Sequence, residues 1–419
     1  MAVNTIAGGT TGAAAGADGE QWLLPAGETL SNDSWDIVFT FGAFSNVTLI
    51  VAGEITQLGL GSGIGASTGS AGNTLLVEPG GSVSGFTAGV VGISSAGSRI
   101  VNQGTITGNQ SYGTMTTGVG SSLLNEGTIT STGFYGAVVA SGGTATNSGT
   151  ISTTAHGYAG LLFGWAEGGG LVTNSGTISG FYGVQFTDDG NTLVNVGTVR
   201  TTEQHAVFGG NGNDRVINLG RIEGYVSFGD GDDFLDSTQS AHIGFVFGEA
   251  GDDRLATGDG NNFIRGGLGN DFLSGGRGRD FLDGEDDNDV IKGNRGSDYL
   301  RGGAGDDLIR GGGGDDNIRG EEGADILFGG MGDDEMVGGT EADVFVFDLK
   351  TGQDTINDFE NGIDLIDLTR LDIAGFAALN AAISIRYTHA FIDLALLGGS
   401  GTIKVKGEAG LLDETDFIL

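Results

Sequence analysis

A nine-residue repeat is the feature that most constrains this chain. Between Gly248 and Val346 the sequence contains eleven consecutive copies of Gly-Gly-x-Gly-x-Asp-x-apolar-x, among them GGLGNDFLS, GGRGRDFLD and GGAGDDLIR. A short period without a break indicates a solenoid in which each copy stacks on its neighbours. The glycines allow a tight loop, the sixth-position carboxylate is a hard oxygen ligand, and the eighth-position apolar residue points into a core. The pattern therefore predicts a β-solenoid whose loops bind calcium.

The nonapeptides resemble the RTX (repeats-in-toxin) calcium-binding β-roll, over about a quarter of the chain. In that family each copy forms half a turn, a loop followed by a short strand, so that loops two copies apart stack and share ions. The resemblance implies two edges of calcium ligands. One edge would use Asp253, Asp271, Asp289, Asp307, Asp325 and Asp343, and the other would use Asp280, Asp298, Asp316 and Asp334.

Some copies depart from this pattern. Two degenerate copies towards the N-terminus, GGNGNDRVI and FGDGDDFLD, carry Asp214 and Asp233 at the ligand position. Asn262 replaces the carboxylate in one copy, and Asp287 and Glu341 replace the fourth-position glycine in two others. The resemblance implies Asp214 and Asp233 as further ligands.

Negative charge is concentrated in the same half of the chain. Residues 1–207 carry 12 acidic and 2 basic side chains and residues 208–419 carry 42 and 16, which gives net charges of −10 and −26. A glycine-rich segment with that charge repels itself where calcium is scarce, and millimolar external calcium neutralises it. We therefore expect calcium binding and folding to be one event. The chain contains no cysteine, so calcium would replace disulfides as the source of stability.

A second, longer repeat occupies the first half of the chain. It has the form apolar-apolar-x-Asn-x-Gly-Thr-Ile-x, as in RIVNQGTIT and SLLNEGTIT, with a period of 21 to 27 residues. The period and its short β-branched runs predict a parallel β-helix with one coil per repeat. Each coil carries a second apolar stretch, as at 134–140, 158–164 and 181–186. The repeated asparagines are Asn102, Asn125, Asn147, Asn174, Asn195 and Asn218.

Alternation along these strands points one apolar residue of each coil into the core. The predicted core ladder is Ile106, Ile129, Ile151, Ile178, Val199 and Ile222. The asparagines are expected to stack at a turn, where their amides bond to one another and to backbone groups rather than to a ligand. In architecture the segment resembles the glycine-rich coils of bacterial adhesins and autotransporter passenger domains.

One stretch, GGNGNDRVINLGRIEG, belongs to both repeats, so we expect the two solenoids to share a core without a flexible linker near 208–247. The predicted fold class is all-β: a parallel β-helix continuous with an RTX parallel β-roll, followed by a small C-terminal β-rich cap. The predicted domains are 1–207, the N-terminal cap and parallel β-helix; 208–346, the calcium-binding β-roll; and 347–419, the cap and secretion-signal domain.

The segment after Val346 resembles the C-terminal domain that follows RTX repeats in serralysin-type proteases and related secreted proteins. Asp416 followed by Phe417, Ile418 and Leu419 is similar to the acidic residue plus three apolar residues that a type I secretion channel recognises in that group. The resemblance implies export by the type I secretion machinery to the cell surface or the medium. Residues 1–22 lack a basic n-region and an apolar h-region, so no conventional signal peptide is expected, and no stretch is apolar enough for a membrane span.

The sequence offers no catalytic residues. Serralysin proteases require a His-Glu-x-x-His zinc site, which this chain lacks. A polysaccharide lyase or epimerase on the β-helix stays open, although residues 46–207 hold only two basic groups, and one adjacent acid pair, Asp188 and Asp189. A soluble glycan- or ice-binding module also stays open, because an outward hydroxyl ladder would start from Thr105, Thr128, Thr150 and Thr177.

We therefore expect a non-enzymatic, secreted, calcium-stabilised structural or adhesive β-solenoid that binds several Ca²⁺ ions. Self-assembly into a homo-oligomer or filament, as a surface layer or matrix, is favoured because solenoid ends expose unpaired strand edges. A cell-surface glycan is a second candidate partner. The net charge of −36 and the lack of a basic patch argue against nucleic acid as a partner.

Overall fold

The structure is a computed structural model of the chain. It describes residues 3–5, 13–14, 19–32, 39–40, 45–57, 64–66, 71–85, 90–93, 96–110, 112–116, 118–140, 142–164, 168–187, 190–240, 243–348, 350–387, 389–407 and 412–419. The acid pair considered for a lyase, Asp188 and Asp189, lies outside the described residues.

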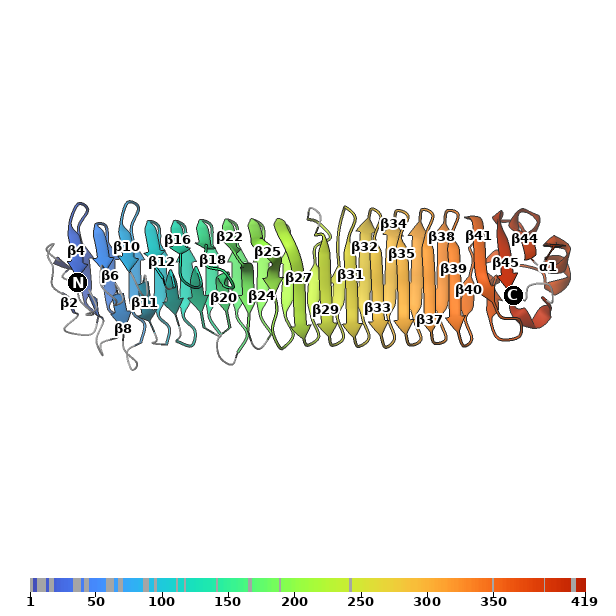
Figure 1. Ribbon diagram of the computed structural model, residues 1–419, viewed down its shortest axis with the longest axis horizontal. Coiled ribbons are helices and arrows are strands. Elements are labelled where there is room, and N and C mark those ends of the chain that lie inside the picture. The colour runs from blue at the N-terminus through green and yellow to red at the C-terminus, as the bar shows by residue number, and fades with distance from the viewer. Residues whose placement is uncertain are drawn as a thin grey trace. The chain divides into compact units, whose positions relative to one another are not determined.

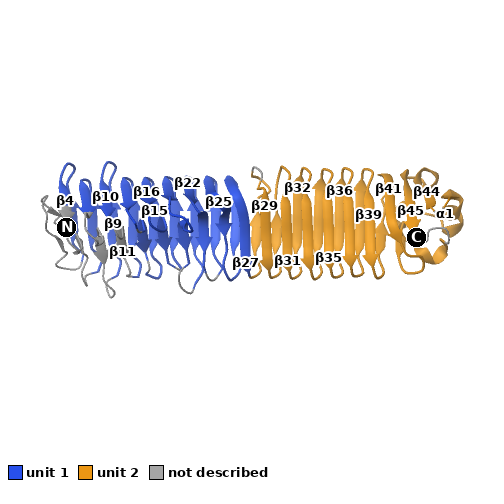
Figure 2. Cartoon of the chain, in the orientation of Figure 1, with its two compact units in different colours: residues 1–230 blue, residues 231–419 orange. Residues whose placement is uncertain are grey.

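The chain forms two compact units, an N-terminal unit of residues 1–230 and a C-terminal unit of residues 231–419 (Figure 2). Each unit is a parallel β-solenoid, and the described part of the C-terminal unit adds one short α-helix and an antiparallel region. The nearly all-β parallel solenoid confirms the predicted fold class. The three-domain division and the continuity of the two solenoids stay predictions.

The coils between Gln21 and Phe186 contain three strands each, the first in one sheet and the other two in a second sheet, whereas in the last two coils a single long strand takes both places in the second sheet. Strands of successive coils lie side by side (Figure 1). The first sheet contains β1 (Val3–Thr5), β3 (Gln21–Leu24), β6 (Thr48–Val51), β9 (Thr74–Val77), β12 (Arg99–Asn102), β15 (Ser122–Asn125), β18 (Thr144–Asn147), β21 (Leu171–Asn174), β24 (Thr192–Asn195) and β26 (Arg215–Asn218).

The second sheet of this unit contains β2 (Ala13–Ala14), β4 (Thr29–Asn32), β5 (Phe39–Thr40), β7 (Glu54–Gln57), β8 (Ile64–Ala66), β10 (Ser82–Gly85), β11 (Val90–Ile93), β13 (Thr105–Gly108), β14 (Thr114–Thr116), β16 (Thr128–Ser131), β17 (Ala137–Val139), β19 (Thr150–Thr153), β20 (Ala159–Phe163), β22 (Thr177–Gly180), β23 (Tyr182–Phe186), β25 (Thr198–Phe208) and β27 (Arg221–Asp230). Strands β17, β20 and β23 confirm the second apolar stretch predicted for each coil.

The core ladder of the N-terminal unit is the predicted one. Parallel register places Ile106 opposite Ile129 and Ile129 opposite Ile151, and the same alignment continues to Ile222. All six side chains are buried. The glycine of each Asn-x-Gly-Thr turn is needed for this stacking, because a Cβ on Gly127 or Gly149 would overlap a carbonyl oxygen of the preceding coil.

The C-terminal unit has two strands per turn (Figure 1), because each nonapeptide contributes a single strand. One face contains β28 (Phe234–Asp236), β30 (Arg254–Ala256), β32 (Phe272–Arg277), β34 (Val290–Arg295), β36 (Leu308–Gly313), β38 (Ile326–Met331), β40 (Val344–Val346), β42 (Leu365–Asp367) and β46 (Phe417–Ile418). The other contains β29 (Phe245–Ala250), β31 (Phe263–Leu268), β33 (Phe281–Asp286), β35 (Tyr299–Ala304), β37 (Asn317–Glu322), β39 (Glu335–Thr340), β41 (Lys350–Phe359), β43 (Ile383–Arg386), β44 (His389–Asp393) and β45 (Ser400–Gly407).

The eighth-position residues of the nonapeptides form the core of this unit. From Leu255 to Phe345 each has no exposed surface. Register pairs them two copies apart, as for Leu273 with Ile291 and Ile291 with Ile309. The nonapeptide period therefore places every second apolar side chain on the same face of the roll.

After Val346, β41 and β42 continue the two parallel sheets, and the predicted β-rich cap follows. Helix α1 (Phe376–Ala382) precedes an antiparallel sheet of β43, β44 and β45, and β45 pairs in parallel with β41. The 3₁₀ helices η1 (Thr369–Leu371), η2 (Leu394–Leu397) and η4 (Glu414–Asp416) lie in the connections. Asp416 and Phe417 are buried and β46 pairs with β42, whereas Ile418 and Leu419 are exposed, so only the first two residues that resemble a secretion signal are packed in the folded chain. Every helix among the described residues falls short of the length and apolarity that crossing a bilayer requires.

Candidate metal centre

Sixth-position residues stack along two rows in the C-terminal unit. The backbone N–H of each donates to Oδ1 of the aspartate one turn later, at 2.7–3.0 Å within the nonapeptides. One row joins Asp253, Asp271, Asp289, Asp307, Asp325 and Asp343. The other joins Asn262, Asp280, Asp298, Asp316 and Asp334. The structure thus brings together the two edges that the sequence predicted.

The second carboxylate oxygen of each aspartate, Oδ2, is buried and has no hydrogen-bond partner. This holds for Asp253, Asp271, Asp280, Asp289, Asp298, Asp307, Asp316, Asp325, Asp334 and Asp343. Their side chains are at most 3% exposed. A buried carboxylate oxygen without a partner is costly, and a cation is the group that would satisfy a regular row of them.

The first-position glycines make room for these oxygens. A Cβ on Gly302 would overlap Oδ2 of Asp307 and would also lie against the carbonyl oxygen of Gly320 in the next loop. Two hard oxygens from adjacent loops therefore face the space that glycine leaves open. Ca²⁺ prefers this donor set, since it accepts backbone carbonyl oxygens as well as carboxylates.

Among the described residues, no three histidine, aspartate or glutamate side chains converge on one point. The stacked loops do not require such a cluster. Each gap between two loops is bordered by carboxylates and by carbonyl oxygens of those loops. The residues present therefore fit calcium. When bound, the ions would supply positive charge between the loops and complete the coordination of Oδ2.

Burial makes these carboxylates hard to ionise without a cation. It raises the pKa to about 8 for Asp271, Asp289, Asp316 and Asp325. It raises the pKa to about 7 for Asp253, Asp307 and Asp343, and to about 6 for Asp298 and Asp334. The pKa of Asp280 is also raised by burial. Calcium must displace protons from these sites, so its binding is coupled to pH.

The copies that depart from the pattern keep its geometry. Asn262 donates through Nδ2 to the carbonyls of Gly260 and Gly275 at 3.0 and 3.1 Å, which a carboxylate could not do. Asp287 and Glu341 adopt φ values of 74° and 76° in place of glycine, and each accepts an N–H from the loop one turn earlier. These two carboxylates add charge beside the loops at the expense of backbone strain.

The degenerate copies place their aspartates in different units. In the N-terminal unit, Asp214 is 2% exposed and accepts the N–H of Asn191 at 2.6 Å. In the C-terminal unit, Asp233 is 3% exposed and its N–H donates to Oδ1 of Asp253 at 2.7 Å. Both positions follow the hydrogen-bond pattern of the aspartate rows, and their role as ligands stays a prediction.

Sequence reasoning missed two exposed rows, one along each edge, formed by the fifth-position residues. Oδ1 of Asp252 accepts the N–H of Asn270, and Oδ1 of Asp315 accepts the N–H of Asp333, at 2.8 and 2.9 Å. These bonds run from a later turn to an earlier one, opposite to the buried rows. The recurring Asp, Asn and Ser at this position is the signal in the sequence that could have revealed them.

Asparagines form a row of their own in the N-terminal unit, as predicted, at the ends of strands and not at the position that the aspartates take. Nδ2 of each donates to Oδ1 of the next at 2.7–2.8 Å, from Asn102 through to Asn218. Each of these amides also donates to a carbonyl oxygen at the start of a neighbouring strand, such as that of Thr150 for Asn125. The row is buried and neutral, which confirms its structural role.

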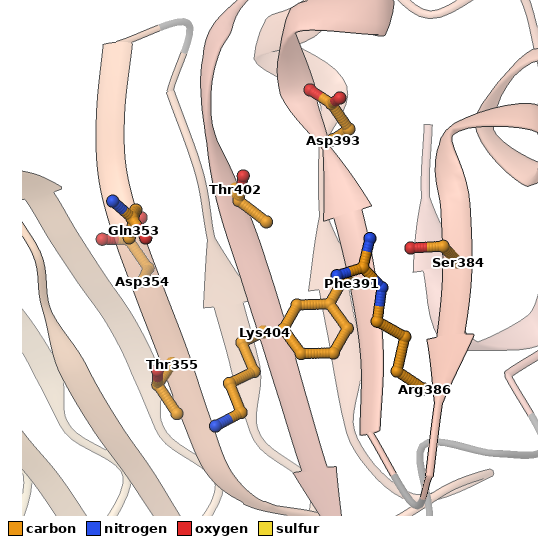
Figure 3. Close-up of a pocket in the computed structure, with 9 residues that line it drawn as sticks. All are labelled: Gln353, Asp354, Thr355, Ser384, Arg386, Phe391, Asp393, Thr402 and Lys404. Atoms are coloured by element: carbon orange, nitrogen blue, oxygen red, sulfur yellow. The ribbon is translucent and has the colours of Figure 1, made fainter.

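The C-terminal cap contains a polar groove of about 430 Å³ over β41, β43, β44 and β45 (Figure 3). Gln353 and Thr355 line one side, and the guanidinium of Arg386 lies 5.6 Å from the ring centre of Phe391 on the other. Lys404 and Asp393 are also part of the lining. The groove gathers two cations in a chain of net charge −36.

Comparison with known families identifies the stretch that forms the aspartate rows. Residues 247–282, 283–318 and 310–345 match the RTX calcium-binding nonapeptide repeat (4 copies). No curated protein matches the chain. Repeats of this kind are typical of extracellular proteins exported by type I secretion. The nonapeptides of this chain are RTX repeats that bind multiple Ca²⁺ ions, and the stacked aspartates are the structure they form.

Proposed function

We propose that this protein is a secreted structural or adhesive solenoid that calcium locks into its folded form outside the cell. The observation that carries the proposal is the row of buried, unpartnered Oδ2 atoms on both edges of the C-terminal unit. In a compartment poor in calcium these carboxylates oppose folding, and in a calcium-rich medium they bind ions. The same chain therefore stays unfolded enough for export inside the cell and becomes rigid outside it.

We expect such a protein to act through an interaction surface and not by catalysing a reaction. In the N-terminal unit, half-buried aromatic rings follow one another from coil to coil: Tyr112 contacts Tyr135 at 5.9 Å and Tyr135 contacts Tyr158 at 5.1 Å between ring centres. The stripe continues through Phe181 and Tyr182. Aromatic side chains of this kind are enriched at protein interfaces, which supports an adhesive or assembling role.

Calcium also bears on self-assembly. The chain carries a net charge of −36, and copies of it repel one another until cations neutralise the exposed carboxylates. We expect the protein to form homo-oligomers or filaments in millimolar calcium and to be monomeric in chelator. Light scattering across a calcium titration, followed by electron microscopy, tests this expectation. Monomers that persist in millimolar calcium at high protein concentration would contradict it.

The second candidate is a soluble glycan- or ice-binding module, favoured by the hydroxyl rows. Thr105, Thr128, Thr150 and Thr177 are aligned in register on successive coils. They are exposed or half-buried, and a neighbouring hydroxyl of Thr130 donates to that of Thr107 at 3.3 Å. A Thr128→Val, Thr150→Val double variant that abolishes binding to a glycan array or to ice would favour this module over the assembly.

A further inference from the structure

The row of carboxylates that contains Asp334 does not stop where the nonapeptides stop. Asp354 follows 20 residues later, and its Oδ1 accepts the N–H of Asp334 at 3.1 Å, as Asp334 does for Asp316 at 2.9 Å. Asp354 is 1% exposed, and its Oδ2 has no hydrogen-bond partner. As in the aspartates of the repeats, one oxygen of Asp354 therefore accepts a backbone N–H and the other is buried.

The loop that carries Asp354 stacks as a nonapeptide loop does. A Cβ on Gly352 would overlap the carbonyl oxygen of Gly332, as one on Gly332 would overlap that of Gly314. The N–H of Gln353 donates to Oδ1 of Asp333 at 2.8 Å, which continues one of the exposed fifth-position rows. Ile356 takes the buried eighth position, opposite Met336.

The other row ends differently. Oδ1 of Asp364 accepts the N–H of Asp343 at 3.1 Å, and its Oδ2 accepts the N–H of Glu360 at 2.8 Å. Asp416 lies beyond it, and its two oxygens accept the N–H groups of Gly362 and Asp413. Backbone donors thus satisfy both oxygens of these carboxylates, which leaves no unpartnered oxygen for a cation.

We infer that Asp334 and Asp354 hold a calcium ion outside the matched repeats, and that Asp364 closes the opposite row without one. The inference rests on the proposed function, since it requires that the repeats themselves bind calcium. It assigns a ligand to the segment 347–419, in which the sequence predicted only a cap and a secretion signal. The repeat pattern in the sequence does not reveal this loop. Its aspartate follows the preceding one by 20 residues, and Leu349 and Lys350 stand in place of the two glycines.

An ion at this position would tie the cap to the roll. Asp354 lies opposite Ile403 of β45, and β45 in turn pairs with β44 beside the polar groove (Figure 3). Ile403 is buried and apolar, so Asp354 is the last carboxylate of its row. Calcium would therefore order the cap as well as the repeats.

The Thr351 hydroxyl is the competing partner for Asp354. Its Oγ1 is buried in the same loop, near enough to the carboxylate to oppose, as a hydrogen-bond donor, the rise that burial causes in the pKa of Asp354. If the hydroxyl donates to Oδ2 of Asp354, the loop needs no ion. The two arrangements differ in the number of calcium ions bound, which can be measured directly.

The test uses the full chain and two isosteric variants, Asp354→Asn and Asp364→Asn. Bound calcium is counted by equilibrium dialysis and elemental analysis, and amide hydrogen exchange is followed in β41 and β45. We expect Asp354→Asn to bind one ion fewer per chain and to exchange faster in both strands at saturating calcium. Asp364→Asn should bind as many ions as the parent, although it loses the bond from Glu360 and is less stable.

An Asp354→Asn variant with the parent's calcium count would overturn the inference and favour pairing with Thr351. Loss of an ion in Asp364→Asn would overturn the second half of it. Asp354→Ser, which is smaller and uncharged, replaces Asp354→Asn in the same two measurements if the asparagine variant does not fold. A parent chain that binds no calcium would instead contradict the proposed function.

Discussion

The two units stack their turns with different polar rows, amides at the ends of strands such as β15 in one and carboxylates just before strands such as β36 in the other. In the N-terminal unit, the amide of Asn125 donates to Oδ1 of Asn147 and accepts from Asn102, so each amide oxygen from Asn125 to Asn218 has a donor within the row. In the C-terminal unit, Oδ1 of Asp307 accepts a backbone N–H, and Oδ2 is left without a donor. A carboxylate has no N–H to donate to the next side chain of the row, so a cation must satisfy the oxygen that lacks a donor.

This difference assigns the calcium dependence to one region. A neutral row whose amides hydrogen-bond to one another stabilises its coils at any calcium concentration. A row of buried carboxylates stabilises its turns only when ions are bound.

Chelation should unfold the turns between Gly248 and Val346 and leave the coils between Arg99 and Ile222 folded. The reason is that calcium-binding free energy is folding free energy where ligands are buried charges. Hydrogen exchange measured in calcium and in excess chelator checks this, because the two regions give separate peptides. Equal protection of both regions in chelator would remove the contrast between them.

Substitution Asn147→Asp should destabilise the N-terminal unit by at least about 3 kcal/mol, in calcium and in chelator alike. The new carboxylate would face Oδ1 of Asn174, which now accepts from the amide, and would leave a buried charge unpaired. Urea denaturation of the full chain, followed by hydrogen exchange in β18 and β21, gives the change. Asn147→Ala, which adds no charge, is the control and should cost about 1–3 kcal/mol. A calcium-dependent rescue of Asn147→Asp would mean that this row also binds ions.

Substitutions Asp307→Ala and Asp316→Ala should each raise the calcium concentration at the folding midpoint about tenfold or more, equivalent to at least ~1.4 kcal/mol. Each removes a ligand from one edge, and neighbouring sites weaken because ions between stacked loops draw on two copies. Circular dichroism during a calcium titration measures the midpoint. The control is Asp315→Ala, which removes the same charge from one of the exposed rows. If the control shifted the midpoint as far as Asp316→Ala, net charge rather than ligation would be responsible.

In chelator, lowering the pH from 8 to 5 should restore folding of the C-terminal unit. Burial raises the folded-state pKa of its aspartates to between about 6 and 8, above the ordinary 3.8, so the folded state binds more protons than the unfolded state. This contribution is fully present below about pH 4 and is lost as the pH rises through 6 to 8. The asparagine row does not titrate and should show no such trend. Circular dichroism in chelator that shows β-structure increasing as the pH rises would contradict the assignment.

The sequence was most informative where the period is unbroken. Constant spacing identified the core ladder ending at Ile222 and both edges of aspartates, because a residue at a fixed place in each repeat must occupy a fixed place in the stack. It failed where insertions change the spacing. Asp354 and Asp364 follow the preceding aspartates of their rows by 20 and 21 residues, so the constant spacing did not identify them. Each still precedes a buried isoleucine by two positions.

The antiparallel pairing in the cap could not be predicted from the repeat pattern either. The pairing of β45 with β41 joins residues about fifty positions apart, and no period in the sequence encodes it. The hydrogen bond from Gly362 to Asp416 is a contact of the same kind, between segments 54 residues apart. Such contacts depend on how the cap packs, which local spacing does not determine.

Anomalous diffraction from crystals grown in calcium would locate the ions and identify the oxygens that bind them. We expect peaks at about 2.3–2.6 Å from Oδ2 of the stacked aspartates between Asp253 and Asp343. We expect no peak beside the asparagine row from Asn102 to Asn218. Calcium bound only to the exposed fifth-position carboxylates, with the buried Oδ2 atoms paired to other protein groups, would contradict the assignment of the buried aspartates as ligands.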